Sequence, residues 1–141
     1  MQRKVNVVED LDGNKIVVIH DIRFKGRQAI EWNDVEQYLK QYVGEAHIIK
    51  STNDMVYIGT DLPEEYAHSN YTNTLKGANA KAKANAAQGI PEMLMIADER
   101  YNVFFAILLV RHAEDKRLYL YDIMKIKKET STHFQSEDFT Q

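Results

Sequence analysis

Lys76 and Lys83 have the spacing of a phosphate-binding helix face. They are seven residues apart in the chain, which places both on one side of a helix. Asn79 lies between them, and Thr72 lies one turn earlier. Ammonium and amide donors on one face can hold phosphate oxygens. The same spacing is typical of solvated lysines beside a buried alanine stripe, so the pattern leaves both interpretations open.

A histidine, His68, lies between Tyr66 and Ser69 in a segment that we expect to be a loop between a strand and a helix. The ordinary pKa of a histidine side chain is about 6.5, so this group could exchange protons near neutral pH. The alternative is a surface histidine followed by a helix N-cap at Ser69.

Two predicted strands near the C-terminal end supply the remaining candidates. Arg111 could balance the negative charge of a phosphorane-like transition state, and His112 could exchange protons. Adjacent residues of a regular strand point to opposite faces, so at most one of the two faces a given site. The alternative for both is a strand end that enters a polar turn.

Asp122 is a carboxylate within an apolar strand, so it needs a partner if it is buried. Arg23, Arg111 or a backbone N–H group could provide that partner. A structural role is the favoured interpretation of this residue.

The N-terminal third of the chain predicts a hairpin, a helix and two short strands. Residues 4–19 are rich in Val and Ile around an Asp-Gly turn, which predicts a β-hairpin. Asn33 is a candidate N-cap of a helix that ends before Gly44. Residues 46–50 and 55–59 then predict two strands.

The elements that carry the candidate residues follow. The alanine-rich segment 71–88 predicts a helix whose small apolar face can lie close against a sheet. Pro91 begins a second, short helix. Residues 101–111 and 117–127 predict two long antiparallel strands, the first of them apolar on both faces and therefore covered on both sides.

These elements predict an α+β fold. We expect an N-terminal hairpin and helices packed on an antiparallel sheet that ends in a long C-terminal β-hairpin. The length of 141 residues suits one domain, which we place at residues 1–129. Polar residues 130–141 predict a tail.

Composition excludes several classes of protein. The sequence has no cysteine, which excludes disulfide scaffolds and zinc sites built from thiolates. It has no Gly-rich phosphate loop and no metal-binding histidine spacing, so we expect neither a metal nor a cofactor. The longest apolar run, 103–110, is far shorter than the about 20 residues of a membrane helix. With no signal-peptide pattern after Met1, we expect a cytoplasmic protein without membrane contact.

The net charge is −3 and the isoelectric point is about 5.9. Proteins that bind nucleic acid usually carry a basic balance. Any nucleic-acid site in this chain must therefore be a local patch.

Three stretches, taken in order, resemble a known family. They are residues 57–69, the alanine-rich residues 76–86, and residues 101–129. Together they resemble the large polyvalent protein-associated domains of bacterial phage and conjugative-element proteins, which are assigned to the barnase–EndoU–colicin E5/D–RelE nuclease-like fold. The resemblance covers roughly residues 55–129, and residues 1–54 resemble the N-terminal extension of the same phage-type proteins.

The resemblance implies metal-independent cleavage of RNA by general acid–base chemistry, with the 2′-hydroxyl group of RNA as the attacking group. It makes RNA the expected partner. The implied catalytic residues are His68, Arg111 and Tyr66, and the implied phosphate- or RNA-binding residues are Lys76, Lys83 and Asn79.

One departure from the family pattern bears on activity. Similar proteins have a longer segment, with a stretch that contains Trp and Arg, where residues 97–100 here join the second helix directly to the next strand. That stretch could hold catalytic or substrate-binding groups. The alternative function is a catalytically inactive interaction or accessory module of the same fold. The acidic isoelectric point favours this module, whereas the lysine face with a nearby histidine favours the nuclease.

Overall fold

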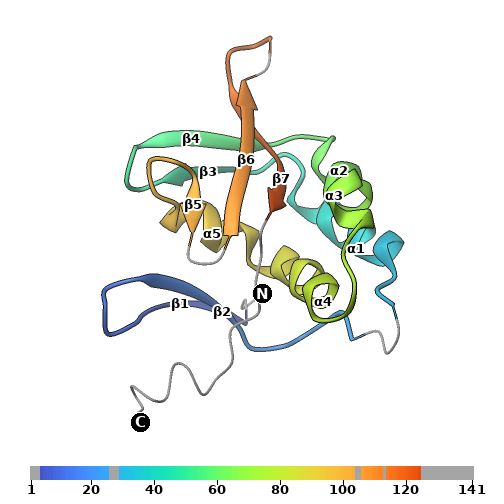
Figure 1. The fold of residues 1–141 in the computed structure, drawn as a ribbon. Coiled ribbons are helices and arrows are strands. Elements are labelled where there is room, and N and C mark those ends of the chain that lie inside the picture. The colour runs from blue at the N-terminus through green and yellow to red at the C-terminus, as the bar shows by residue number, and fades with distance from the viewer. Residues whose placement is uncertain (1–3, 26–28, 104–105, 113, 125–141) are drawn as a thin grey trace.

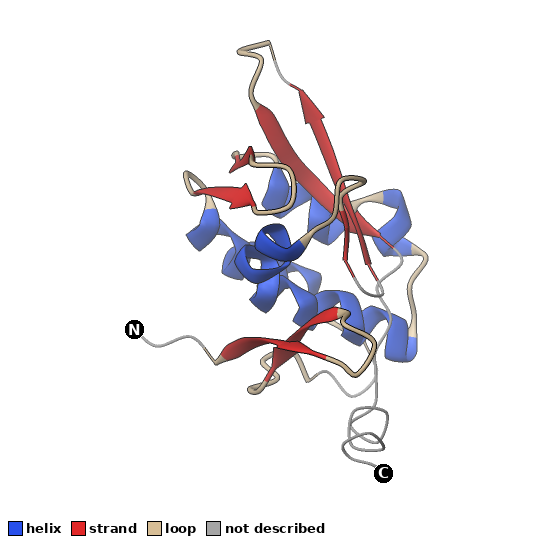
Figure 2. Cartoon of the chain, turned by 90° about the vertical axis from the view of Figure 1, so that its left-hand side faces the viewer, coloured by secondary structure: helices blue, strands red, loops and turns tan. Residues whose placement is uncertain are grey.

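The computed structural model describes residues 4–25, 29–103, 106–112 and 114–124. These residues form an α+β structure with a two-stranded sheet and a five-stranded sheet, and helices lie between the two sheets (Figure 1). Figure 2 shows the same arrangement from the side. Among the described residues, no helix combines the length and the apolar character that crossing a membrane requires.

The two-stranded sheet is the predicted N-terminal hairpin. β1 (Val5–Glu9) pairs antiparallel with β2 (Lys15–Ile19), and Gly13 in the turn has a φ of +86°, which a glycine adopts without strain. The hairpin packs on the 3₁₀ helix η2 (Ala87–Gly89) and on α5 (Ile90–Ile96). The prediction of a hairpin at residues 4–19 is confirmed.

The next helix has the predicted buried stripe but begins earlier than predicted. α1 (Trp32–Leu39) continues into the 3₁₀ helix η1 (Lys40–Tyr42), and Val35, Leu39 and Tyr42 are fully or almost fully buried. The N-cap residue is Glu31 rather than Asn33, and its side chain makes no capping hydrogen bond. The apolar period therefore located the helix but not its first residue.

The five-stranded sheet is mixed, not wholly antiparallel as predicted. Its strand order is β3 (Ala46–Ile49), β4 (Asp54–Ile58), β7 (Leu118–Met124), β6 (Ala106–His112), β5 (Asn102–Val103). β4 and β7 run parallel, and the other neighbouring pairs are antiparallel. A parallel pair needs a long connection between its strands, and here α2 to α5 together with β5 and β6 form it.

The predicted strand at residues 101–111 is in fact two strands. Tyr101 has a φ of +62°, which no regular strand adopts, and Val103 pairs back onto Ala106. The antiparallel hairpin of β6 and β7 is confirmed within the described residues. The predicted extension of the last strand to residue 127 and the polar tail 130–141 lie outside them.

A β-bulge changes which residues of β7 are buried. Leu109 pairs with Asp122, whereas Val110 pairs with Leu120, so Tyr121 is an extra residue between them. As a result Ile123 is buried and Met124 is half-buried, the reverse of what strict alternation predicts.

The predicted alanine-rich helix is interrupted. α3 (Asn70–Asn73) and α4 (Gly77–Ala86) are separate helices, because Lys76 is extended (φ −141°, ψ 157°) and Gly77 has a φ of +56°, and neither conformation continues a right-handed helix. The preceding α2 (Leu62–His68) packs on β7, and the short predicted helix that begins near Pro91 is confirmed as α5.

Gly89 gives a test of the contact between the hairpin and the helical layer. A Cβ atom at this position would lie 2.8 Å from Val17 Cγ1, so Gly89→Ala should overpack the contact. We expect a loss of about 1–3 kcal/mol in the free energy of unfolding, measured by urea denaturation. The loss should be smaller in a Val17→Ala background, which removes the clashing methyl group. Equal losses in both backgrounds would contradict this packing.

Candidate functional site

Lys83, predicted to lie on a polar helix face, is completely buried. Its exposed fraction is 0%, and its ammonium group lies 2.6 Å from Asp122 Oδ1 and 2.6 Å from Thr72 Oγ1. The rings of Tyr66 and Tyr71 flank the charge, with centroids 4.6 and 5.1 Å from Nζ. The expectation of an exposed Lys83 is therefore wrong. It was common to both interpretations of the helix face, the phosphate-binding one and the one with solvated lysines.

The partner of Asp122 is Lys83, which was not among the expected partners, together with the backbone N–H of Ile123 at 2.8 Å. Burial lowers the pKa of the Lys83 ammonium, while the charge of Asp122 and its hydrogen bond act in the opposite direction. The pair is thus a structural connection between α4 and β7, in keeping with the structural role favoured for Asp122.

Tyr66, implied by the resemblance to be catalytic, belongs to the same buried network. Its hydroxyl donates to the backbone carbonyl of Lys83 at 2.6 Å, and its own carbonyl accepts from Thr72 Oγ1 at 2.7 Å. Burial raises the pKa of Tyr66 well above its ordinary value, and the charge of Asp122 adds to this effect. The phenol is therefore neutral and inaccessible in this structure.

His68 lies in the last turn of α2, not in a loop as predicted. Its Nε2 atom is 2.9 Å from Glu36 Oε1 on α1, so the imidazole joins two helices at the surface. Ser69 follows as the N-cap of α3, where its hydroxyl accepts from the N–H of Thr72, as one interpretation of this segment predicted.

Lys76 and Asn79 are exposed at the start of α4. Lys83, the third member of the predicted phosphate-binding set, is buried and so does not share their exposed surface. The structure thus does not bring the implied catalytic and binding residues to a common surface.

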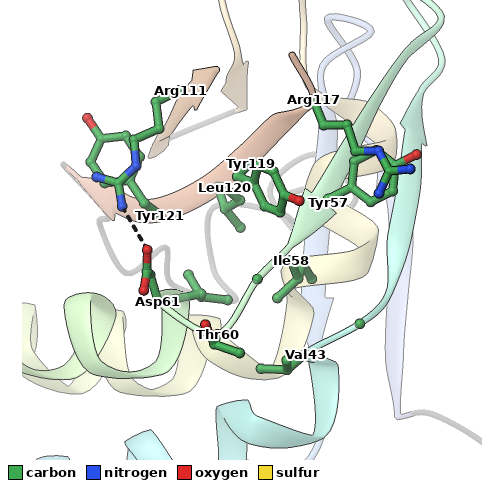
Figure 3. A pocket seen from close by; sticks show the side chains of 13 residues that line it. Val43, Tyr57, Ile58, Thr60, Asp61, Arg111, Arg117, Tyr119, Leu120 and Tyr121 are labelled. Carbon is green, nitrogen blue, oxygen red and sulfur yellow. Dashed lines mark hydrogen bonds and ion pairs between the residues drawn. The ribbon is translucent and has the colours of Figure 1, made fainter. Parts of the chain in front are cut away.

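Arg111 is the implied catalytic residue that lines an open groove. The groove has a volume of about 580 Å³ (Figure 3). It lies at the end of β4, beside β7 and the start of α2. Arg111 donates to Glu65 Oε1 at 2.6 Å and to Asp61 Oδ2 at 3.4 Å, and its guanidinium carbon lies 4.4 Å from the ring centroid of Tyr121. The hydrogen bond with Glu65 raises the pKa of Arg111, so the group stays charged.

The floor of the groove is the outer face of the sheet. Tyr57 on β4 lies beside Tyr119 on β7, and Tyr119 lies opposite Arg111 on β6. These three side chains form a row across adjacent strands. Their strand neighbours on the other face, such as Val56 and Leu120, are buried in the core. Figure 3 shows Tyr119 between the two arginine–tyrosine pairs.

Asp61 has properties that sequence reasoning missed. It is the N-cap residue of α2, but its side chain makes no capping hydrogen bond and is 74% exposed. The carboxylate therefore faces the groove beside Arg111. The alternation of tyrosines with apolar residues in β4 and β7 could have revealed the aromatic face, but only tertiary structure places Asp61 next to Arg111.

Within the described ranges, no three His, Cys, Asp or Glu residues are grouped so that they could hold a metal ion. Comparison of the chain with protein-family models, curated proteins and solved structures finds no match. The resemblance to nuclease-like phage domains therefore stays a prediction.

The buried ion pair predicts a specific pattern of stability. Lys83→Met leaves a buried carboxylate without its counter-ion and should cost about 3–5 kcal/mol of the free energy of unfolding, measured by urea denaturation. The double variant Lys83→Met/Asp122→Leu should recover much of that loss, because no uncompensated charge remains. Lys76→Met is the exposed control and should change stability by less than about 0.5 kcal/mol. Equal effects of the two lysine variants would contradict the buried pair.

Proposed function

We propose that this chain is a metal-independent RNA-cleaving domain whose reacting groups lie in the groove at Arg111. The observation that carries the proposal is the arrangement of Asp61, Glu65 and Tyr121 around the Arg111 guanidinium in an open groove. It pairs a carboxylate that can accept a proton with a cation that can stabilise phosphorane charge. The proposal retains Arg111 from the predicted catalytic set and replaces His68 and Tyr66.

The two carboxylates have different roles in this proposal. Glu65 makes the short contact with Arg111 and holds the guanidinium in place. Asp61, at 3.4 Å from Arg111 and largely exposed, is the carboxylate that can reach a ligand. Asp61 takes the proton from the 2′-hydroxyl group, the 2′-oxygen attacks phosphorus, and the 5′-oxygen leaves with a proton from solvent. The products are a 2′,3′-cyclic phosphate and a 5′-hydroxyl end.

His68 has no step in this scheme. It lies seven residues beyond Asp61, which corresponds to about 10 Å along a helix. Its imidazole is engaged with Glu36, and it is not among the residues that line the groove. Removing the imidazole should therefore leave the chemistry intact.

A catalytically inactive interaction module of a phage or mobile-element protein is the second candidate function. The charge around the groove favours it. Arg111, Arg117 and Asp61 line the groove, and Glu65 and Asp115 bond to lining residues from just outside it, so three carboxylates face two guanidinium groups. Tyrosine and arginine are also enriched at the centres of protein interfaces.

A cleavage assay with mixed single-stranded RNA in EDTA tests the proposed function. Asp61→Asn removes the base and should slow cleavage by about 10²–10⁴-fold, and Arg111→Ala should slow it by about 10²–10³-fold. Matched controls are Asp34→Asn and Arg100→Ala, which change exposed residues outside the groove and should cleave at the wild-type rate.

The same assay separates the alternatives. If the wild-type protein does not cleave RNA, the nuclease proposal is wrong and the interaction module remains. If His68→Ala abolishes cleavage and Asp61→Asn does not, the reacting groups lie at His68 and not in the groove.

A further inference from the structure

The end of the groove away from Asp61 has no part in the chemistry proposed above. It is formed by Tyr57, Tyr119 and Arg117. Tyr57 and Tyr119 are partners in the parallel register of β4 and β7, and their ring centroids are 5.7 Å apart with a 40° angle between the planes. The guanidinium carbon of Arg117 lies 4.8 Å from the centroid of the Tyr57 ring. Planar groups and a cation are thus assembled on the outer face of the sheet.

The Tyr119 ring is held in place from two sides. Its hydroxyl donates to Asp115 Oδ2 at 2.8 Å, and this hydrogen bond raises the pKa of Tyr119. Gly59 lies under the ring, and a Cβ atom there would be only 3.1 Å from Tyr119 Cδ2. A side chain at position 59 would therefore crowd the ring and require a small shift of it. The surface is ordered before any ligand binds, which lowers the cost of binding.

We infer that Tyr57, Tyr119 and Arg117 form a base-stacking subsite for single-stranded RNA, an inference that rests on the proposed function of the groove. Aromatic rings accept bases by stacking without regard to sequence, and arginine contributes stacking and a phosphate contact. The subsite is continuous with the row that ends at Arg111, so a base bound here belongs to the strand whose phosphate lies beside Arg111.

The geometry selects single strands over duplexes. In duplex RNA the faces of the bases are covered by their neighbours, and only unpaired bases can stack on protein side chains.

The charges around the subsite indicate where the backbone of the RNA runs. Arg117 is the cation at this end, and Asp115 is the facing carboxylate, already bonded to the Arg117 N–H and to the Tyr119 hydroxyl. The phosphate therefore lies on the guanidinium side of Tyr57, away from Asp115. A single such contact implies a modest dependence of affinity on salt.

Binding of a short fluorescein-labelled oligouridylate, measured by anisotropy, tests the subsite. All variants carry Asp61→Asn, which under the proposed function slows turnover by about 10²–10⁴-fold, so the oligonucleotide stays intact during the measurement. Tyr57→Ala should weaken binding by about 10-fold, whereas Tyr57→Phe, which keeps the ring, should stay within about two-fold. The same oligonucleotide annealed to its complement should bind at least about 10-fold more weakly.

Each outcome bears on one proposal or the other. Equal affinities for single strand and duplex, an unchanged affinity in Tyr57→Ala, or no binding of either RNA would overturn the subsite. An unfolding midpoint for Tyr57→Ala equal to that of its parent shows that a loss of binding is not a loss of folding. Tyr57-dependent binding without wild-type cleavage would support the subsite and refute the nuclease, whereas cleavage that ignores Tyr57 would do the reverse.

Discussion

The ion pair between Lys83 and Asp122 joins the helical layer to the central part of the five-stranded sheet. A buried ammonium and a buried carboxylate are tolerated only as a hydrogen-bonded pair, so α4 and β7 must meet at this point. Thr72 and Tyr66 complete the network from α3 and α2. The position of α2, and with it the place of Asp61 at its first turn, follows from contacts that lie on the far side of the sheet from the groove.

β7 therefore serves two environments. Leu118, Leu120 and Asp122 are buried, while Tyr119 and Tyr121 are half-buried and line the groove. Alternation along β7 turns Tyr121 toward Arg111 and Asp122 toward Lys83, and the bulge then lets Ile123 be buried beside Asp122. The parallel pairing with β4 then brings Tyr57 beside Tyr119.

Local patterns were sufficient for most elements and insufficient for the site. The N-terminal hairpin, the stripe of α1 and the β6–β7 hairpin follow from period and turn residues, which act over a few positions. The interruption before α4 lies at the extended Lys76 and at Gly77 with its positive φ, whereas the helix propensity of the alanine-rich segment predicts a continuous helix. The parallel pair and the burial of Lys83 depend on contacts between residues far apart in the chain. The residue type of Lys83 predicts an exposed side chain, because a lysine is almost never fully buried unless it is paired. Its partner Asp122 is 39 positions away in the chain, so no local pattern reveals the pair.

The electrostatic balance of the groove restricts the ligands that the proposed function allows. A net excess of carboxylates opposes a polyanion in general, so an anionic ligand can be held only where a guanidinium is closer to it than any carboxylate is. At Arg111, Glu65 and Asp61 both bond to the guanidinium and the ring of Tyr121 lies against one of its faces. Under the proposed function the phosphate lies against the opposite face. At Arg117, the side chains of Asp115 and Tyr119 are already bonded to each other. If the proposed function holds, the RNA is held by local contacts at the two arginines, and charge alone provides only a limited affinity.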